Sequence, residues 1–314
     1  MSAARKSLIL HLGLIGGLFA LAFILPSYHH GNLARIMVLA TYAIGYNVLF
    51  GYTGLLSLGH AMFFAAGMYG MGLAMQFGGV PALPALILGV IAATVLAAVV
   101  AVLALRTIGV AFMIVTLMFA QTGFLTILYF GEWTRGDEGF VLQQEVRRIA
   151  GLDLSDPMTR YLAAWLLFSA ALLATARMMH VAFGGVLVAI RENEERTRML
   201  GYNVFAHKFA AVVISGAIAG AAGAAYGLLF GYVGATFAAV QYSIFPLLWV
   251  LLGGAGTTIG PFIGALFMFY LIDWSSGLTS AYMLIAGVVL VLLTLFARAG
   301  IAGEIRRRWA PWLP

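Results

Sequence analysis

About ten apolar segments follow one another along this chain, and they constrain its fold more than any other feature. A helix needs roughly 20 apolar residues to cross the hydrocarbon core of a bilayer. The segments lie at residues 8–25, 33–50, 60–77, 83–105, 108–130, 161–176, 209–231, 235–252, 258–272 and 279–297. They are continuous and rich in Leu, Ala, Val and Gly, whereas the strands of a membrane barrel alternate apolar and polar residues. We therefore predict an all-α, polytopic integral membrane protein with about ten transmembrane helices.

The composition supports this prediction and excludes several kinds of function. Hydrophobic residues make up 63% of the 314 residues, against roughly 45–50% in soluble domains. The chain has no cysteine, which excludes disulfides, thiolate catalysis and cysteine-bound metals. The net charge of +6 does not indicate a nucleic-acid partner, because Lys and Arg orient membrane proteins and no basic patch interleaved with aromatic residues is present.

Charge placement predicts how the chain crosses the membrane, since cytoplasmic loops carry an excess of Lys and Arg. Arg5 and Lys6 precede a first apolar run that is longer than a signal-peptide core, so we expect a retained span that starts inside. Five crossings place the net acidic segment 131–160 outside, and the sixth leads to the inner loop 177–208. The basic residues of that loop and of the tail 298–314 are Arg177, Arg191, Arg196, Arg198, Lys208, Arg298, Arg306, Arg307 and Arg308. Both termini are therefore predicted to be cytoplasmic.

A short repeated motif indicates an inverted repeat. GYTG at 51–54 and GYVG at 231–234 each follow the second helix of a predicted five-helix half. An odd number of spans in each half turns the second half upside down relative to the first. We therefore predict two inverted halves, residues 1–130 and 161–297, joined by the extracytoplasmic loop 131–160.

The sequence RENEERTR, at 191–198, concentrates charge in the predicted inner loop. Residues 186–200 are predicted to form one helix that is closed by Gly201. Glu192 with Arg196, and Glu194 with Arg198, have the favourable i,i+4 order, worth about 0.2–0.5 kcal/mol for each pair. An apolar stripe on the opposite side would consist of Val186, Ile190, Thr197 and Leu200. Such a helix can lie along the inner membrane face. The alternative is a solvated loop helix whose charges only provide the excess of Lys and Arg that is usual in cytoplasmic loops.

Two glycine-rich stretches, 51–60 and 251–261, separate predicted helices. GGAGTTIG lacks the Lys-Ser/Thr ending of a phosphate-binding loop and the spacing of a dinucleotide fingerprint, so this chain is not expected to hydrolyse ATP. In a membrane, such stretches permit either tight helix packing or unwound backbone that lines a polar path. Both interpretations stay open for each glycine.

Ionisable residues are rare within the predicted spans. His11 lies in the first span and His60 opens the third, while Arg35 and Asp273 lie at span ends. Buried carboxylates drive most ion-coupled transport, so their scarcity weakens a proton- or sodium-coupled mechanism. No HExxH motif or carboxylate pair lies at membrane depth, and we predict no catalytic residue, metal ligand or cofactor site.

As a set, the motifs resemble the permease subunits of ABC importers for branched-chain amino acids, of the type with an extended outer loop. The similar stretches are GYTGLLSLGHAMFFAAGMYG (51–70), RTIGVAFMIVTL (106–117), TRGDEGF (134–140), AIRENEERTRMLGYN (189–203), KFAAVVISGAIAGAAGAAYG (208–227) and LLGGAGTTIGPFIGA (251–265). They cover most of the chain in the order seen in the family. The resemblance implies a bacterial inner-membrane protein that is a transporter subunit and not an enzyme.

The resemblance also implies partners and roles for particular residues. The partners would be a homologous second permease, two ATPase subunits that carry the ATP and Mg, and an extracytoplasmic solute-binding protein. Helix 186–200 would be the coupling helix, with contact residues Arg191, Glu192, Glu194, Glu195, Arg198 and Gly201. Path or gate residues would be Gly51, Gly54, Ser57, Gly59, His60, Gly253, Gly254 and Gly256. Asp137 and Glu138 would contact the binding protein.

The sequence departs from the family pattern at a few positions. Glu195, Arg196 and Thr197 stand where apolar or small residues are usual, which suggests a matched ATPase. Leu55 replaces a common Gln and Met68 a common Ala, which leaves the substrate open among branched-chain and other hydrophobic amino acids or related small molecules. Two other classes of function remain as alternatives: a secondary transporter driven by an ion gradient and a membrane enzyme that acts on lipid.

Overall fold

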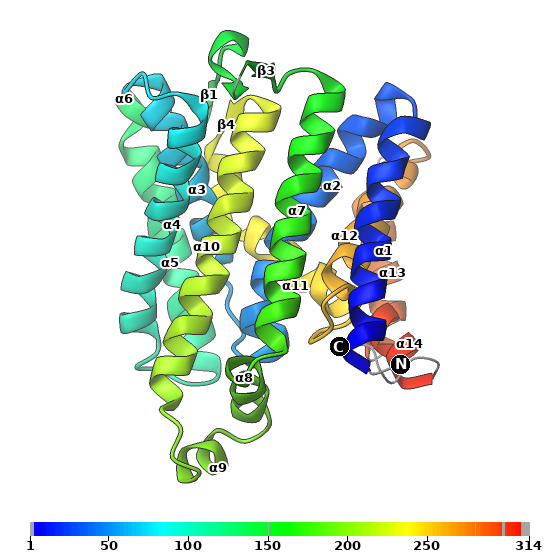
Figure 1. Cartoon of the computed structure of the whole chain (residues 1–314). Helices are drawn as coiled ribbons and strands as arrows, with labels where there is room; N and C mark the ends of the chain where they lie inside the picture. The colour runs from blue at the N-terminus through cyan, green and yellow to red at the C-terminus, as the bar shows by residue number, and fades with distance from the viewer. Residues whose placement is uncertain (1–2, 150, 280, 297–298, 309–314) are drawn as a thin grey trace.

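The computed structural model describes residues 3–149, 151–279, 281–296 and 299–308. Ten of its helices occupy the positions of the ten predicted apolar segments (Figure 1). These are α1 (Ala3–Ile24), α2 (Ser27–Asn47), α3 (His60–Gln76), α4 (Ala82–Ala104), α5 (Val110–Tyr129), α7 (Pro157–Met179), α10 (Val204–Phe230), α11 (Val240–Gly253), α12 (Gly260–Ser276) and α13 (Tyr282–Phe296). Arg298 and residues 309–314 of the predicted tail lie outside the described residues. The prediction of an all-α, polytopic membrane protein is confirmed.

Six helical segments within the described residues are long and apolar enough to cross a membrane. They are α1 from Lys6, α2 together with the π-helical segment η1 (Val48–Tyr52), α4, α5, α7 and α10. The other four, α3, α11, α12 and α13, have 14 to 17 residues. Two polar and glycine-rich segments interrupt the helical backbone next to three of these helices. Segment 53–59 precedes α3, and segment 254–259 separates α11 from α12, so these helices are short.

Short elements occupy the two ends of the bundle. One end, called here the α6 end, carries α6 (Gly131–Thr134), β1 (Phe140–Val141), η2 (Gln144–Val146), β2 (Arg148–Ile149), β3 (Leu152–Asp153) and β4 (Tyr232–Val233). The 3-10 segment η3 (Ala235–Ala238) follows β4 and packs against α3 and α5. The opposite end, the α8 end, carries α8 (Ala182–Glu192), α9 (Glu194–Met199) and α14 (Gly300–Arg308), and α1 starts there (Figure 1). The strands are two-residue pairs, β1 with β4 and β2 with β3, both antiparallel.

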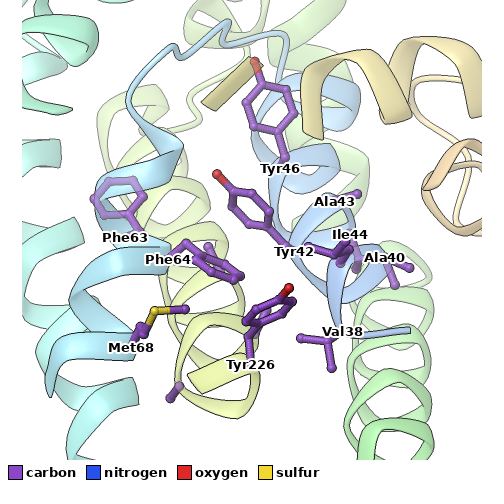
Figure 2. Packing of buried hydrophobic residues seen from close by; sticks show 14 of the residues in the cluster. Val38, Ala40, Tyr42, Ala43, Ile44, Tyr46, Phe63, Phe64, Met68 and Tyr226 are labelled. Atoms are coloured by element: carbon purple, nitrogen blue, oxygen red, sulfur yellow. The ribbon is translucent and has the colours of Figure 1, made fainter. Parts of the chain in front are cut away.

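The helices α2 and α10 form the centre of the bundle. The α2 helix packs on α7, α10, α11 and α12, and α10 packs on α2, α3 and α4. Between them, the buried rings of Tyr42, Phe64 and Tyr226 come together from α2, α3 and α10 (Figure 2). A Cβ added to Gly223 would collide with the carbonyl of Phe64, so α3 and α10 touch through their backbones. Small residues permit this close approach, which is typical of helix packing in membranes.

The packing has the pattern that an inverted repeat predicts. If α2, α3 and α4 are matched with α10, α11 and α12, contacts come in corresponding pairs: α3–α4 with α11–α12, α3–α10 with α2–α11, and α4–α10 with α2–α12. The chain leaves α2 at the α8 end and leaves α10 at the α6 end (Figure 1). GYTG and GYVG therefore lie at opposite ends of the bundle, as the proposed inversion requires.

Among the helices that begin earlier than the hydropathy pattern predicts, α7 and α10 are each preceded by a polar residue that caps the helix. α7 starts at Pro157 after Asp156, whose carboxylate accepts a hydrogen bond from the Thr159 backbone N–H at 2.9 Å. That hydrogen bond also lowers the pKa of the Asp156 carboxyl. α10 starts at Val204 after Asn203, whose Oδ1 accepts from the Ala206 N–H at 3.0 Å. Side-chain caps of this kind extend a helix beyond its apolar run.

Candidate functional site

The two glycine-rich segments meet at the α8 end of the bundle, and Asn47 joins them. Its Nδ2 donates to the Thr257 carbonyl at 2.9 Å, and its Oδ1 accepts from the Gly256 N–H at 3.0 Å. Asn47 is the last residue of α2 and is fully buried. A Cβ on Gly51 would collide with this amide, so Gly51 must be glycine for the junction to form. We name residues 47–59 and 253–259 together the gate segments.

Arg191 of α8 reaches into the gate segments. Its Nη1 donates a hydrogen bond to the Gly51 carbonyl. Gly54 and Gly256 both have positive φ, +76° and +75°. A Cβ at Gly54 would lie 3.0 Å from Arg191 Cγ, and one at Gly256 would lie 2.8 Å from Arg191 Nη1. The structure thus brings together one predicted coupling residue, Arg191, and three predicted gate glycines.

The single helix predicted at 186–200 is wrong. The chain breaks at Asn193, which is extended (φ −159°, ψ 102°) and separates α8 from α9. The Asn193 side chain accepts a hydrogen bond from the Arg196 N–H at 2.8 Å and so caps α9. Asn competes for backbone hydrogen bonds and favours caps over helix interiors. Because the break separates Glu192 from Arg196, the predicted ion pair between them does not form among the described residues.

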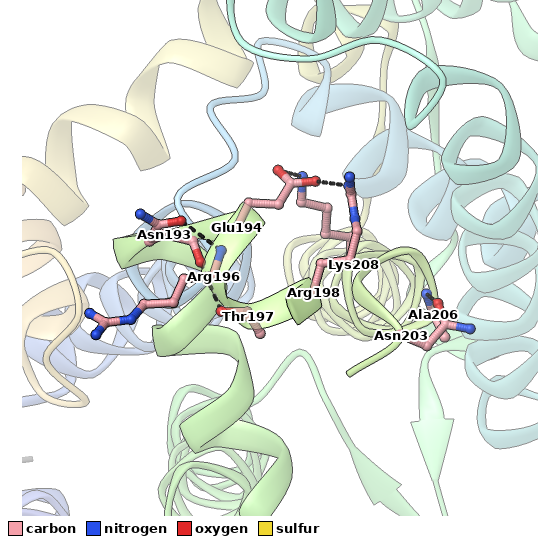
Figure 3. Close-up of polar contacts among 8 residues, drawn as sticks. All are labelled: Asn193, Glu194, Arg196, Thr197, Arg198, Asn203, Ala206 and Lys208. Atoms are coloured by element: carbon pink, nitrogen blue, oxygen red, sulfur yellow. Dashed lines mark hydrogen bonds and ion pairs between the residues drawn. The ribbon is translucent and has the colours of Figure 1, made fainter. Parts of the chain in front are cut away.

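The second predicted pair is present and is extended by a third residue. Glu194 accepts from Arg198 at 3.2 Å and also pairs with Lys208, which is 8% exposed in the first turns of α10 (Figure 3). The carboxylate of Glu194 therefore ties α9 to the central helix α10. Sequence analysis placed Lys208 only in the basic loop, since its pairing across 14 residues depends on the chain reversal between the helices.

The apolar stripe of the predicted coupling helix is partly wrong. Val186, Ile190 and Val204 form a small buried cluster, and Thr197 is buried beside its hydrogen bond to the Asn193 carbonyl. Leu200 is 70% exposed, and Met199 is 78% exposed. Gly201 has φ +88°, as expected of the residue that ends a helix. Glu192 and Glu195 are both exposed.

The second gate segment is held by close backbone contacts. A Cβ on Gly253 would collide with the Gly260 carbonyl of α12. Gly254 has φ +120°, and a Cβ there would lie 2.8 Å from the Gly303 N of α14. His11 Nε2 and Thr258 Oγ1 lie 2.7 Å apart, so α1 also holds this segment. For Gly253 and Gly254 the packing interpretation accounts for the glycine.

Ser57, Gly59 and His60 are buried between η1 and α3. Ser57 Oγ accepts from the Gly59 N–H at 3.2 Å. A Cβ on Gly59 would collide with the Thr116 carbonyl. His60 Nε2 lies 2.7 Å from Ser215 Oγ, while its Nδ1 has no hydrogen-bond partner among the described residues. In this conformation the three residues pack against neighbouring helices.

A cavity of about 490 Å³ opens beside the gate segments at the α8 end. Its polar side chains come from η1, α8, α14 and the end of α7, and Gly256 of the second gate segment also lines it. The lining residues are Tyr52, Met179, His180, Val188, Arg191, Glu192, Gly256 and Arg306. Within the part of the chain that is described, no group of three His, Asp or Glu side chains is arranged to hold a metal ion.

Asp137 and Glu138 lie at the α6 end, far from this site, in the turn between α6 and β1. Both are exposed. The turn is anchored, because β1 pairs with β4 and the Tyr232 hydroxyl donates to the Glu138 carbonyl at 2.9 Å. Residues 131–149 of the predicted extracytoplasmic loop therefore form a cap that is fixed to the end of α10.

Arg147 is a buried anchor of that cap. Its side chain is 8% exposed, and it donates to the carbonyls of Leu228 and Leu229 at 2.8 and 2.7 Å. These carbonyls belong to the last turn of α10, where no intrahelical partner remains. No local pattern in the outer segment indicates this burial, because the partners of Arg147 lie 81 and 82 residues away in the sequence.

Comparisons with known proteins place this arrangement in context. The family described as the permease component of branched-chain amino acid transport systems matches residues 30–297. One relative is the high-affinity branched-chain amino acid transport system permease protein LivM of Escherichia coli K12. It is 27% identical over 288 residues, which cover 84% of this chain and 68% of the relative. The protein of the same name from Salmonella typhimurium matches with the same values. A probable LivM of Methanocaldococcus jannaschii is 34% identical over 107 residues, covering 33% of this chain and 31% of the relative. No solved structure matches.

Proposed function

The chain belongs to the permease family of branched-chain amino acid transport systems, and from this premise we propose that it forms half of the translocation pathway of an ATP-driven importer. It is a multi-pass membrane transport protein, and its family is one of transporter subunits and not of enzymes. We propose that ATP and Mg bind on two separate ATPase subunits and that this chain carries no cofactor. The transported compounds would be branched-chain or other hydrophobic amino acids.

The observation that carries this proposal is the double attachment of α8 and α9 to the central helices. Arg191 of α8 bonds to the Gly51 carbonyl directly after α2, and Glu194 of α9 pairs with Lys208 of α10. A displacement of α8 and α9 by a partner would therefore reach both central helices. Rigid-body rocking of packed helices is a common way to alternate access to a transport path.

The outer surface of α8 and α9 has the character of a docking site. α9 projects beyond the rest of the bundle (Figure 1), with Met199 and Leu200 exposed next to the charged side chains. Exposed apolar residues rimmed by polar ones often mark a protein interface. The proposed ATPase contacts are Arg191, Glu192, Glu194, Glu195, Arg198 and Gly201.

The proposed orientation follows from this assignment. The α8 end would face the cytoplasm of a bacterial cell and the α6 end the outside, with the chain in the inner membrane. Asp137 and Glu138 would then be presented to a solute-binding protein on an anchored turn. A homologous second permease, either another chain or a copy of this one, would complete the path, and residues 1–130 and 161–297 would be its two inverted halves.

The proposal is tested by purifying the tagged chain in mild detergent and identifying what co-purifies at fixed stoichiometry. We expect a second permease and ATPase subunits. The double substitution Glu192→Arg with Glu195→Arg keeps the pair between Glu194 and Lys208, and should leave the protein folded but uncouple uptake from ATP hydrolysis. A chain that purifies alone under several gentle conditions and drives uptake from an ion gradient would replace the importer by a secondary transporter.

A further inference from the structure

The cavity at the α8 end brings opposite charges and apolar side chains together in one hollow. It is lined by two arginines, Arg191 and Arg306, one carboxylate, Glu192, and the apolar side chains of Met179 and Val188. We propose that this cavity binds the free zwitterion of an apolar α-amino acid, so that the imported compound also binds at the exit end of its own permease. This inference rests on the substrate class of the proposed function.

Arg306 and Glu192 have no ion-pair partner among the described residues, so their charges are available to a ligand. The other acidic residues near this end already have basic partners, since Glu194 pairs with Lys208 and Arg198, and Glu304 pairs with Arg307 and Arg308. Arg306 has no carboxylate within ion-pair distance among the described residues. Guanidinium groups bind carboxylates through paired, charge-assisted hydrogen bonds. Arg306 and Arg191 therefore suit the carboxylate of an amino acid, and Glu192 suits its ammonium group.

Tyr52 contributes an aromatic side chain to the lining of the cavity. Its hydroxyl is buried beside the Asn47 side chain, which joins the gate segments. The cavity therefore borders the junction of the gate segments, and a ligand bound in it would lie next to that junction.

The size and the apolar lining of the cavity fit a whole amino acid. Its volume is about 490 Å³, within the range of roughly 300–1,000 Å³ that is typical of small-molecule sites. Met179 and Val188 are half-buried and offer apolar surface beside the charged groups. His180, Arg191, Glu192 and Arg306 are exposed, so the cavity is open to solvent at this end.

Binding here would have a consequence for transport. A ligand held between Arg306 of α14 and Glu192 of α8 would link these two helices beside Gly256 of the gate segments. Such a link would oppose movement of α8, on which the proposed coupling depends. A high concentration of the imported amino acid at the α8 end would therefore slow its own import.

Calorimetric titration of the purified, folded full-length chain with L-leucine tests the proposal. The variants are Arg306→Gln and Glu192→Gln, with Arg307→Gln as the matched control, because Arg307 lies on α14 but does not line the cavity. We expect saturable binding that weakens about tenfold or more in each of the two cavity variants, as loss of one charge-assisted contact predicts, and is unchanged in the control. Leucinamide and 4-methylpentanoate, which lack one charge each, should bind about tenfold more weakly than leucine.

Three results would overturn the inference. The first is no leucine binding at concentrations up to the order of 10 mM, where even a millimolar site would fill. The second is binding that neither cavity variant weakens, and the third is equal binding of inorganic phosphate, which would mark a simple anion site. Each result leaves the importer proposal standing if ATPase subunits still co-purify with the chain, so the two proposals fail separately.

Discussion

Replacing Arg191 by Gln tests whether the contact between α8 and the gate segments transmits force. The substitution removes the guanidinium that donates to the Gly51 carbonyl and keeps a polar side chain of shorter reach. A hydrogen bond to a charged group contributes about 1.5–3 kcal/mol. Since about 1.4 kcal/mol corresponds to a factor of ten, an equilibrium that depends on this contact would shift roughly 10- to 150-fold.

The assay measures amino-acid uptake and ATP hydrolysis together, in proteoliposomes that contain the co-purified complex. We expect Arg191→Gln to lower uptake per ATP hydrolysed at least about tenfold, the lower end of that range, while the complex still assembles. Arg177→Gln is the matched control, because Arg177 is exposed in the last turn of α7 at the same end and is not among the proposed ATPase contacts. Exposed substitutions usually change free energies by less than about 0.5 kcal/mol, so the control should stay within about a factor of three of the parent chain. Equal coupling in Arg191→Gln and the parent, at equal protein levels, would refute the reasoning.

Two further substitutions test the packing and the outer cap. Gly223→Ala should lower the midpoint of thermal unfolding in detergent, because the added Cβ collides with the Phe64 carbonyl and overpacking typically costs about 1–3 kcal/mol. Gly13→Ala is the control and should not lower the midpoint, because its Cβ would meet no atom within 4 Å. Equal midpoints for the two variants would contradict the observed packing. Arg147→Gln should lower the free energy of unfolding by about 1–3 kcal/mol, because it leaves buried carbonyls of α10 unpaired. Arg148→Gln, at an exposed position of β2, is the control and should have little effect. Chemical unfolding measures both free energies, and similar losses would show that Arg147 does not anchor the cap.

The apolar pattern was sufficient to predict the positions and order of ten of the helices, but not where these helices end. Runs of apolar residues report burial in lipid or protein, and they continue through the whole membrane depth. Helix ends depend on caps such as Asp156 and Asn203, which lie outside the runs. Asn193 was likewise placed inside one continuous helix at 186–200, although its side chain caps α9.

The candidate site was only partly predictable because its contacts are long-range. Arg191, Gly51, Gly54 and Gly256 were each singled out from local motifs, but no local pattern indicated that one arginine joins them. Asn47 was missed, although a polar residue at the end of a buried apolar helix is a signal that could have identified it. Its partners are about 210 residues away in the sequence, since it bonds to the second gate segment.

The central claim is that α8 and α9 contact an ATPase, and the absence of native cysteine permits a direct test. Met199→Cys places a single reactive thiol on the exposed surface of α9, and Val141→Cys, also exposed, places one at the α6 end as the control. Each variant is labelled with a photoactivated crosslinker in the active complex, and the adducts are identified by mass spectrometry. The account predicts that Met199→Cys crosslinks to an ATPase subunit and that Val141→Cys does not. An active complex in which the Met199→Cys probe forms no ATPase adduct, or in which only the Val141→Cys probe does, would contradict it.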